Sequence, residues 1–149
     1  MRRWGLAIVV VAASFLMDPS FVSACSCVAF TKAQLVENAD VIFTGTVTER
    51  TGGTSFGFGP GGCYQTTGID PIRVTFTVET VYKGDAPTRV TLNTASNSAA
   101  CGYEFVADKR YTVFATGSGD TLATNLCRGN ESGAIVPAVY GLGAGRPPR

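Results

Sequence analysis

Apolar and polar residues alternate through much of the chain, and this alternation predicts β-strands. From Asp40 onward, apolar side chains recur at every second position with threonines between them. The clearest example runs from 72 to 82, where Val74, Phe76 and Val78 alternate with polar residues. A period of two is typical of strands with one buried face. We therefore predict five strands, over residues 41–48, 72–82, 89–94, 110–116 and 121–127.

The segments around these strands have different patterns. Residues 31–38 can form about two helical turns, with Thr31 as the N-cap. The glycine-rich stretch 51–62 is predicted to be a loop. Asn130-Glu-Ser132 is an acceptor sequence for N-glycosylation, relevant in a eukaryotic host. Residues 131–149 contain Gly, Ala and three prolines, and we expect a loosely ordered tail there, with a short helix around 135–140.

One short helix and five strands predict a mainly β fold. A length of 149 residues suits one domain. Five strands in a small domain are typical of a closed or partly open Greek-key barrel, because closure hides the strand edges. A sandwich of two sheets is the alternative.

Composition excludes several classes of function. The chain has no histidine, which excludes Ser-His-Asp triads, Cys-His dyads and His-ligated metal sites. Its 12 basic and 11 acidic residues give a formal net charge of +1. No basic stretch could neutralise several phosphates, so nucleic acid is not an expected partner. We expect a protein that is not an enzyme and has no cofactor.

Residues 1–24 have the pattern of a secretory leader. Two arginines precede an apolar run at 6–17, and the small residues 22–24 follow. The run is too short for a membrane-spanning helix, so we expect a secreted protein with no integral membrane span. Cleavage after Ala24 would make Cys25 the first residue. The same site fits a bacterial lipoprotein signal, in which Cys25 is lipidated and anchors the domain to the cell envelope.

The chain has five cysteines, which both interpretations of the leader place outside the cytoplasm, where disulfides persist. An odd number requires one cysteine that is unpaired, lipidated or bonded to another molecule. Two of them, Cys25 and Cys27, lie two residues apart in an extended segment and point to opposite sides, so each needs a distant partner. The spacing does not match redox or zinc motifs of the C-x-x-C type. The remaining cysteines are Cys63, Cys101 and Cys127.

Several segments occur in the order found in the tissue inhibitors of metalloproteinases. A leader ending at Ala24 is followed by Cys-Ser-Cys at 25–27, and residues 38–47 (NADVIFTGTV) resemble the first strand of that family. Cys-Gly-Tyr at 101–103 and the stretch 119–127 ending in a cysteine also match. The resemblance covers residues 25–130, the inhibitory N-terminal domain of the family. It implies a five-stranded OB-fold barrel of the netrin-like kind, with disulfides Cys25–Cys101 and Cys27–Cys127 and with Cys63 unpaired.

The resemblance also implies a mechanism. The α-amine and carbonyl oxygen of Cys25 would chelate the catalytic zinc of a target metalloendopeptidase, while the inhibitor itself holds no metal. Ser26 would point into the pocket beyond the scissile bond. The remaining protease-contacting residues would be Cys27, Val28, Ala99 and Ala100.

Two alternatives stay open beside this mechanism. The first is a netrin-like binding module without inhibitory activity. If this module is anchored as a lipoprotein through Cys25, the amine of that residue is blocked. The second concerns assembly: we expect a monomer, whereas a Cys63-linked disulfide would produce a dimer.

Overall fold

The computed structural model describes residues 25–53, 55–59, 62–66 and 71–149. The predicted leader at 1–24 and its cleavage after Ala24 lie outside these residues. One short helix and seven strands occur in the described part: α1 (Lys32–Glu37), β1 (Val41–Thr51), β2 (Ser55–Gly59), β3 (Gly62–Thr66), β4 (Ile72–Lys83), β5 (Arg89–Thr94), β6 (Arg110–Ala115) and β7 (Glu131–Ser132). Short 3-10 helices complete it: η1 (Ser98–Ala100), η2 (Gly119–Thr121), η3 (Leu126–Arg128) and η4 (Pro137–Tyr140).

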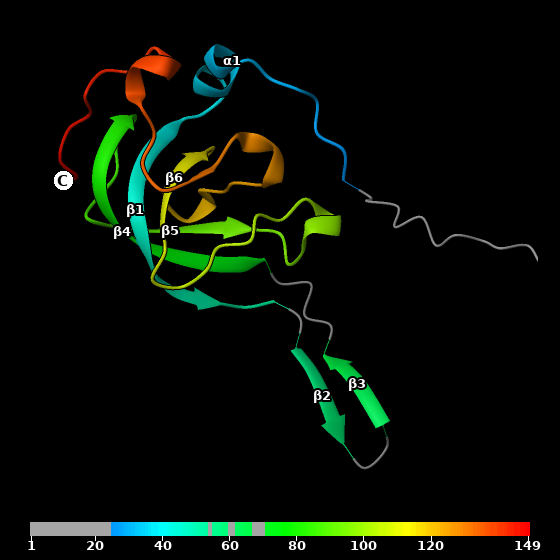
Figure 1. Cartoon of the computed structure of the whole chain (residues 1–149). Coiled ribbons are helices and arrows are strands. Elements are labelled where there is room, and N and C mark those ends of the chain that lie inside the picture. Colours follow the sequence, from blue (N-terminus) through cyan, green and yellow to red (C-terminus); the bar gives the residue numbers. More distant parts are fainter. Residues whose placement is uncertain (1–24, 54, 60–61, 67–70) are drawn as a thin grey trace, which may run out of the picture.

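Five strands form one antiparallel sheet in the order β5-β4-β1-β6-β7, and β2 and β3 form a separate hairpin (Figure 1). The central strand is β1, in which Gly45 lies opposite Val78 of β4 and Tyr111 of β6. A Cβ atom at Gly45 would lie 2.6 Å from the carbonyl oxygen of Thr77. Only glycine therefore allows the close approach of β1 and β4 at this point.

The mainly β fold is confirmed, but the sheet is not closed, so the closed form of the predicted closed or partly open barrel is wrong. The predicted strand at 121–127 does not form, because this segment begins in η2 and ends in η3. Between them, Ala123 forms isolated bridges to Thr116 and to Asn93 of β5. The side chain of Asn125 accepts a hydrogen bond from the backbone N–H two residues later, at 2.9 Å. Such local bonding by a polar side chain competes with a strand ladder, so the segment turns instead of extending.

The other predicted strands are confirmed with small changes at their ends. The strand at 89–94 has the predicted bounds, and those at 72–82 and 110–116 differ by one residue. The first strand continues to Thr51. The hairpin of β2 and β3 begins within the predicted loop at 51–62. The sequence there alternates phenylalanine with glycine, and glycine is depleted in strands, so the β signal is weak.

Hydrophobic clusters cover both faces of the sheet. Ile42 and Phe114 belong to one cluster, whereas their chain neighbours Phe43 and Val113 belong to the other. Neighbouring side chains on a strand point to opposite faces, so the clusters lie on opposite sides of the sheet. Phe76 packs edge-to-face against Phe43, with ring centroids 5.4 Å apart. Burial of each large side chain stabilises the fold by roughly 1.5–3 kcal/mol.

Helix α1 covers the second cluster together with η4, which lies beside it (Figure 1). The predicted N-cap is confirmed: Thr31 and Gln34 form a capping box. At the other end of the helix, Lys83 donates hydrogen bonds to the carbonyl oxygens of Val36 and Glu37, at 2.7 and 3.2 Å. Among the described residues, no helix combines the length and apolar character that crossing a membrane requires.

The C-terminal residues are packed, which corrects the expectation of a loosely ordered tail at 131–149. Ile135 and Tyr140 are buried in the second cluster. The backbone of Arg146 exchanges two hydrogen bonds of 2.8 Å with Val81 of β4. These contacts join residues far apart in the chain, so no local periodicity could indicate them.

Candidate functional site

Two disulfides attach residues 25 and 27 to distant parts of the chain. Cys25 is bonded to Cys101, 76 residues away, and Cys27 to Cys127, 100 residues away. These are the pairs that the resemblance implies. In the chain-entropy view, closing a loop of this size contributes roughly 4–5 kcal/mol, which is a large share of the stability of a small domain.

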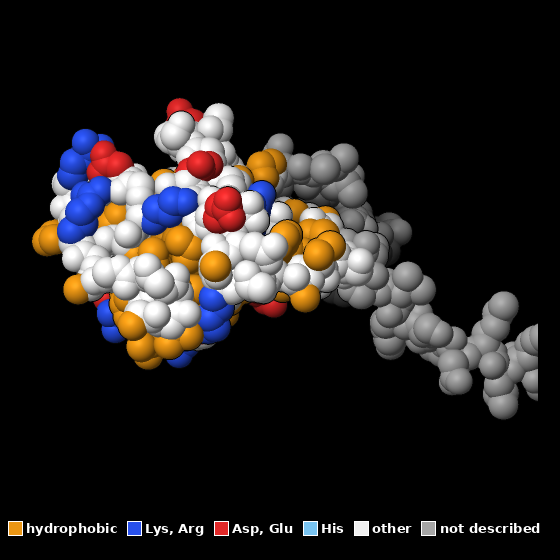
Figure 2. Space-filling model, turned by 90° about the horizontal axis from the view of Figure 1, so that it is seen from above, with side chains coloured by type: hydrophobic (Ala, Val, Ile, Leu, Met, Phe, Trp, Pro, Cys, Tyr) orange, Lys and Arg blue, Asp and Glu red, His pale blue; other side chains and the backbone are white. Residues whose placement is uncertain are grey.

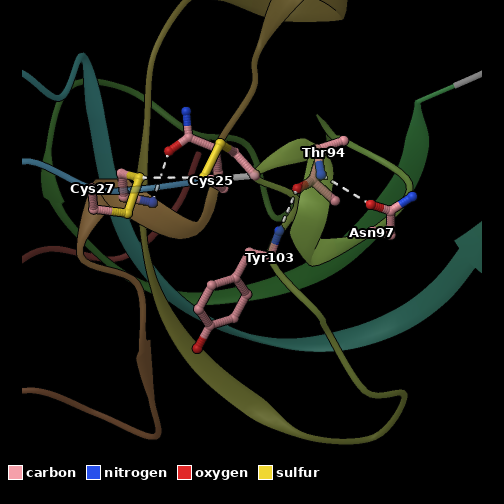
Figure 3. Close-up of a disulfide and its surroundings, with 9 residues drawn as sticks. Cys25, Cys27, Thr94, Asn97 and Tyr103 are labelled. Atoms are coloured by element: carbon pink, nitrogen blue, oxygen red, sulfur yellow. Dashed lines mark hydrogen bonds between the residues drawn. A yellow bond between two sulfur atoms is a disulfide. The ribbon is translucent and has the colours of Figure 1, made fainter. Parts of the chain in front are cut away.

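The segment held by these disulfides is exposed. Cys25 is buried with only 8% of its surface accessible, whereas Ser26 and Cys27 are exposed. Val28 is 74% exposed. Because residues 25 and 27 are each anchored, Ser26 is fixed between two covalent links. The close-up in Figure 3 shows Cys25 and Cys27 side by side.

A second exposed segment lies beside Cys101, the partner of Cys25. The side chain of Asn97 caps η1 by accepting a hydrogen bond of 2.9 Å from the N–H of Ala100 (Figure 3). Ser98 and Ala100 are exposed, while the side chain of Ala99 lies outside the described part of the structure. We call residues 25–28 and 98–100 together the ridge.

Steric contacts explain why the Cys-Gly-Tyr motif has a glycine at position 102. Cys101 has a φ of 63°, in the left-handed region, where the chain leaves η1. A Cβ atom on Gly102 would lie 2.1 Å from the carbonyl oxygen of Ala95, so no larger residue fits under this loop. The N–H of Tyr103 then donates to Oγ1 of Thr94, at 2.9 Å (Figure 3). These contacts hold the loop of the ridge against the end of β5.

Cys127 lies in a turn, residues 124–130, that also contacts the ridge. The N–H of Leu126 donates to the carbonyl oxygen of Cys101, at 2.8 Å. Asn125 and Asn130 hold this turn through their side chains. Sequence reasoning missed both roles: it assigned Asn130 only to a glycosylation sequence, although asparagine near a turn is a recognised signal for side-chain bonding to the backbone.

The fifth cysteine lies apart from this site in the sequence. Cys63 belongs to β3, and its side chain lies outside the described part of the structure. Its unpaired state, and a dimer linked through it, therefore remain predictions.

Three cysteine sulfur atoms lie close together at residues 25–27. The Sγ atoms of Cys25, Cys27 and Cys127 all lie within 4.8 Å of one another. The thiolate is the form of cysteine that binds a metal, and all three sulfurs are held in disulfides. In this oxidised state the cluster acts as a covalent anchor.

Charged side chains of both signs occur together on the surface. On the face shown in Figure 2, Lys and Arg side chains are interspersed with Asp and Glu side chains. Arg110 pairs with Glu79 at 2.8 Å, an exposed contact that contributes about 1 kcal/mol at most. Burial, followed by the nearby Tyr111 and Glu131, raises the pKa of Tyr103 above that of an ordinary phenol.

The comparisons with known proteins give no identification. No protein-family model matches the chain, and no curated protein matches it.

Proposed function

We propose that this protein is a metalloendopeptidase inhibitor whose ridge enters the active-site cleft of a zinc protease. One observation carries the proposal: Cys25 and Cys27 are each tied by a disulfide, and the residues between and after them are exposed. A cleft-binding segment needs both properties. It must reach out of the fold, and it must lose little conformational freedom on binding.

The chemistry of chelation follows from the position of Cys25. Signal cleavage after Ala24 would create an α-amine there, beside the carbonyl oxygen of the same residue. A catalytic zinc keeps one open position, held by water, which this pair of atoms would occupy. The pKa of an α-amine is about 7.7–8.0, so the metal can displace its proton near neutral pH. Ser26 and Val28 would then contact the target on either side of Cys27.

The arrangement of the strands supports a netrin-like barrel, which is also the fold that the resemblance implies. The segment around Ala123 forms bridges to both β5 and the end of β6. It therefore brings two separated strands of the sheet together, as the closing strand of an OB-fold barrel would. We propose that the described domain is a partly open barrel of this netrin-like kind.

The disulfide of Cys25 bears on the lipoprotein alternative. Lipidation of a bacterial lipoprotein attaches the lipid to the cysteine sulfur, and the Sγ atom of Cys25 is bonded to Cys101. One sulfur cannot form both bonds. The disulfide therefore favours secretion, and the intact mass of the native protein tests this directly, because a lipid on Cys25 would add mass and exclude the Cys25–Cys101 bond.

Inhibition is tested with two forms of the refolded domain, one beginning at Cys25 and one with an added N-terminal alanine. Against a panel of zinc endopeptidases, we expect the first form to inhibit and the second to lose about 100-fold or more. No inhibition by either form would reject the proposal. Equal inhibition by both would reject chelation through the amine.

A matched pair of variants tests the contact surface. Val28→Ala removes an exposed valine of the ridge, and Val136→Ala removes one that is 66% exposed elsewhere. We expect only Val28→Ala to weaken inhibition, by about tenfold. An equal effect of the two substitutions would show that the ridge is not the contact surface.

A further inference from the structure

The side chain of Asn130 makes three hydrogen bonds inside the protein, and both of its N–H groups donate. Its Oδ1 accepts from the N–H of Phe114 in β6 at 2.9 Å. Its Nδ2 donates to Oγ1 of Thr124 at 2.9 Å and to the carbonyl oxygen of Asn125 at 3.1 Å. Oγ1 of Thr124 lies 2.7 Å from the carbonyl oxygen of Phe114, so its single proton goes there and it accepts from Asn130.

These bonds join the sheet to the turn that carries Cys127. Asn130 connects β6 to the backbone of Asn125, and the side chain of Asn125 accepts from the N–H of Cys127 at 2.9 Å. The next residue after Asn125 donates to the carbonyl oxygen of Cys101, at 2.8 Å. The turn therefore places Cys127, while Cys101 lies outside it and meets it through a single backbone bond, and Asn130 ties that turn to the sheet.

The same atoms decide whether the sequence Asn130-Glu-Ser132 can carry a glycan. A glycan replaces one of the two N–H groups of Nδ2, and both of these groups donate inside the protein. Asn130 is also partly buried. Attachment would break a bond of the turn and push the chain away from β6.

We propose that Asn130 is a positioning residue: its carboxamide holds the Cys127 turn, and thereby the anchor of the ridge, on β6. The position is closed to N-glycosylation in the folded protein. The effect on inhibition rests on the proposed function, whereas the role of Asn130 in holding the turn does not. The two can therefore fail separately.

The test measures the rate at which a limiting amount of a dithiol reductant reduces each disulfide. Thiols released at early times are alkylated and assigned by peptide mass mapping, in wild type, Asn130→Ala, Asn130→Asp and the control Ser132→Ala. The control destroys the glycosylation sequence at an exposed position while Asn130 remains. Asn130→Asp keeps the acceptor for Phe114 and loses both donated bonds.

We expect Asn130→Ala to open Cys27–Cys127 about tenfold faster relative to Cys25–Cys101 than wild type does. Asn130→Asp should give a smaller increase of this ratio, and Ser132→Ala should leave it unchanged. A purely structural role would accelerate both disulfides by the same factor and would overturn the proposal. If Asn130→Ala does not fold, the comparison of Asn130→Asp with Ser132→Ala tests the proposal. An unchanged ratio of the two disulfide opening rates in Asn130→Asp would overturn the proposal.

Discussion

The Sγ atom of Cys25 lies 3.9 Å from the Sγ atom of Cys127, although the two residues belong to different disulfides. The two disulfides thus pack against each other next to residues 25–27. Residues 25 and 27 are fixed at one place on the domain, and the disulfides form a single unit with two links.

This contact predicts disulfide exchange when one partner is removed. In Cys27→Ser, the thiolate of Cys127 lies next to Cys25 and can attack its sulfur, forming Cys25–Cys127 and releasing the thiolate of Cys101. We expect both isomers in a non-reducing peptide map after incubation at mildly alkaline pH. The substitution Cys63→Ser should accompany it, so that the fifth cysteine takes no part. Recovery of Cys25–Cys101 alone would contradict the prediction.

Removing the Cys27–Cys127 disulfide completely should lower the stability of the domain. In Cys27→Ser/Cys127→Ser, we expect the free energy of unfolding to fall by about 2–5 kcal/mol, because the unfolded chain regains the freedom of a loop of 100 residues. Urea unfolding measures this change, with Cys63→Ser alone as the reference. A loss below about 0.5 kcal/mol would show that the packing of the sheet holds Cys127 in place without its disulfide.

Two glycine substitutions test the steric reason for the Cys-Gly-Tyr motif. Gly102→Ala places a methyl group against the carbonyl oxygen of Ala95, so we expect a loss of about 1–3 kcal/mol and displacement of η1. Gly143→Ala is the control, because a Cβ atom there meets nothing within 4 Å. It should change stability by less than about 0.5 kcal/mol. Thermal and urea unfolding measure the stability of both variants. Equal stability of the two would show that the loop moves aside for the methyl group at position 102 without a measurable cost.

Tyr140 predicts a pH dependence of stability on the alkaline side. Burial, followed by its hydrogen bond to Glu131, raises the pKa of Tyr140 above the ordinary value of a phenol. The folded state therefore favours the neutral phenol, and this contribution is complete below about pH 10, the pKa in the unfolded chain. It is lost as the pH rises above 10, because the unfolded chain ionises first.

Substituting Tyr140→Phe should remove this dependence. At pH 7 we expect it to cost about 1 kcal/mol, the contribution of one hydrogen bond to a partly exposed carboxylate. The difference from wild type should shrink between pH 9 and pH 11 in urea unfolding experiments. A difference that stays constant over this range would show that Tyr140 ionises alike in both states.

Expression through a eukaryotic secretory pathway tests the closed glycosylation sequence. We expect the folded, secreted fraction to carry no N-linked glycan, as judged by intact mass and by an unchanged gel mobility after glycosidase treatment. Any glycosylated fraction should unfold at a lower temperature and reduce more easily at Cys27–Cys127. A glycosylated protein with the stability and disulfides of the unmodified form would contradict the bonding of Asn130.

Local patterns were enough to predict some elements. Strand β5 was predicted with its bounds, because alternation within a few residues reflects one buried face. The cap of α1 was likewise predicted, since Thr31 and Gln34 interact over a single turn. The predictions that were wrong share a different cause. The segment 121–127 was predicted as a strand, but it turns because the side chain of Asn125 accepts from Cys127 and that of Asn130 donates to Asn125. The C-terminal residues are ordered because Ile135 and Tyr140 pack against residues far away in the chain.

The sequence by itself determined the number and order of the cysteines, the alternation of the strands and the absence of histidine. These properties depend on covalent structure or on neighbours along the chain. Only the tertiary structure decided which atoms meet: the contact between the two disulfides, the exposure of Val28 beside them and the bonds of Asn130 to β6. Such distances join residues many positions apart, and they depend on how the sheet curves and how its strands align. No short stretch of sequence specifies that curvature, because it results from the packing of all the strands together.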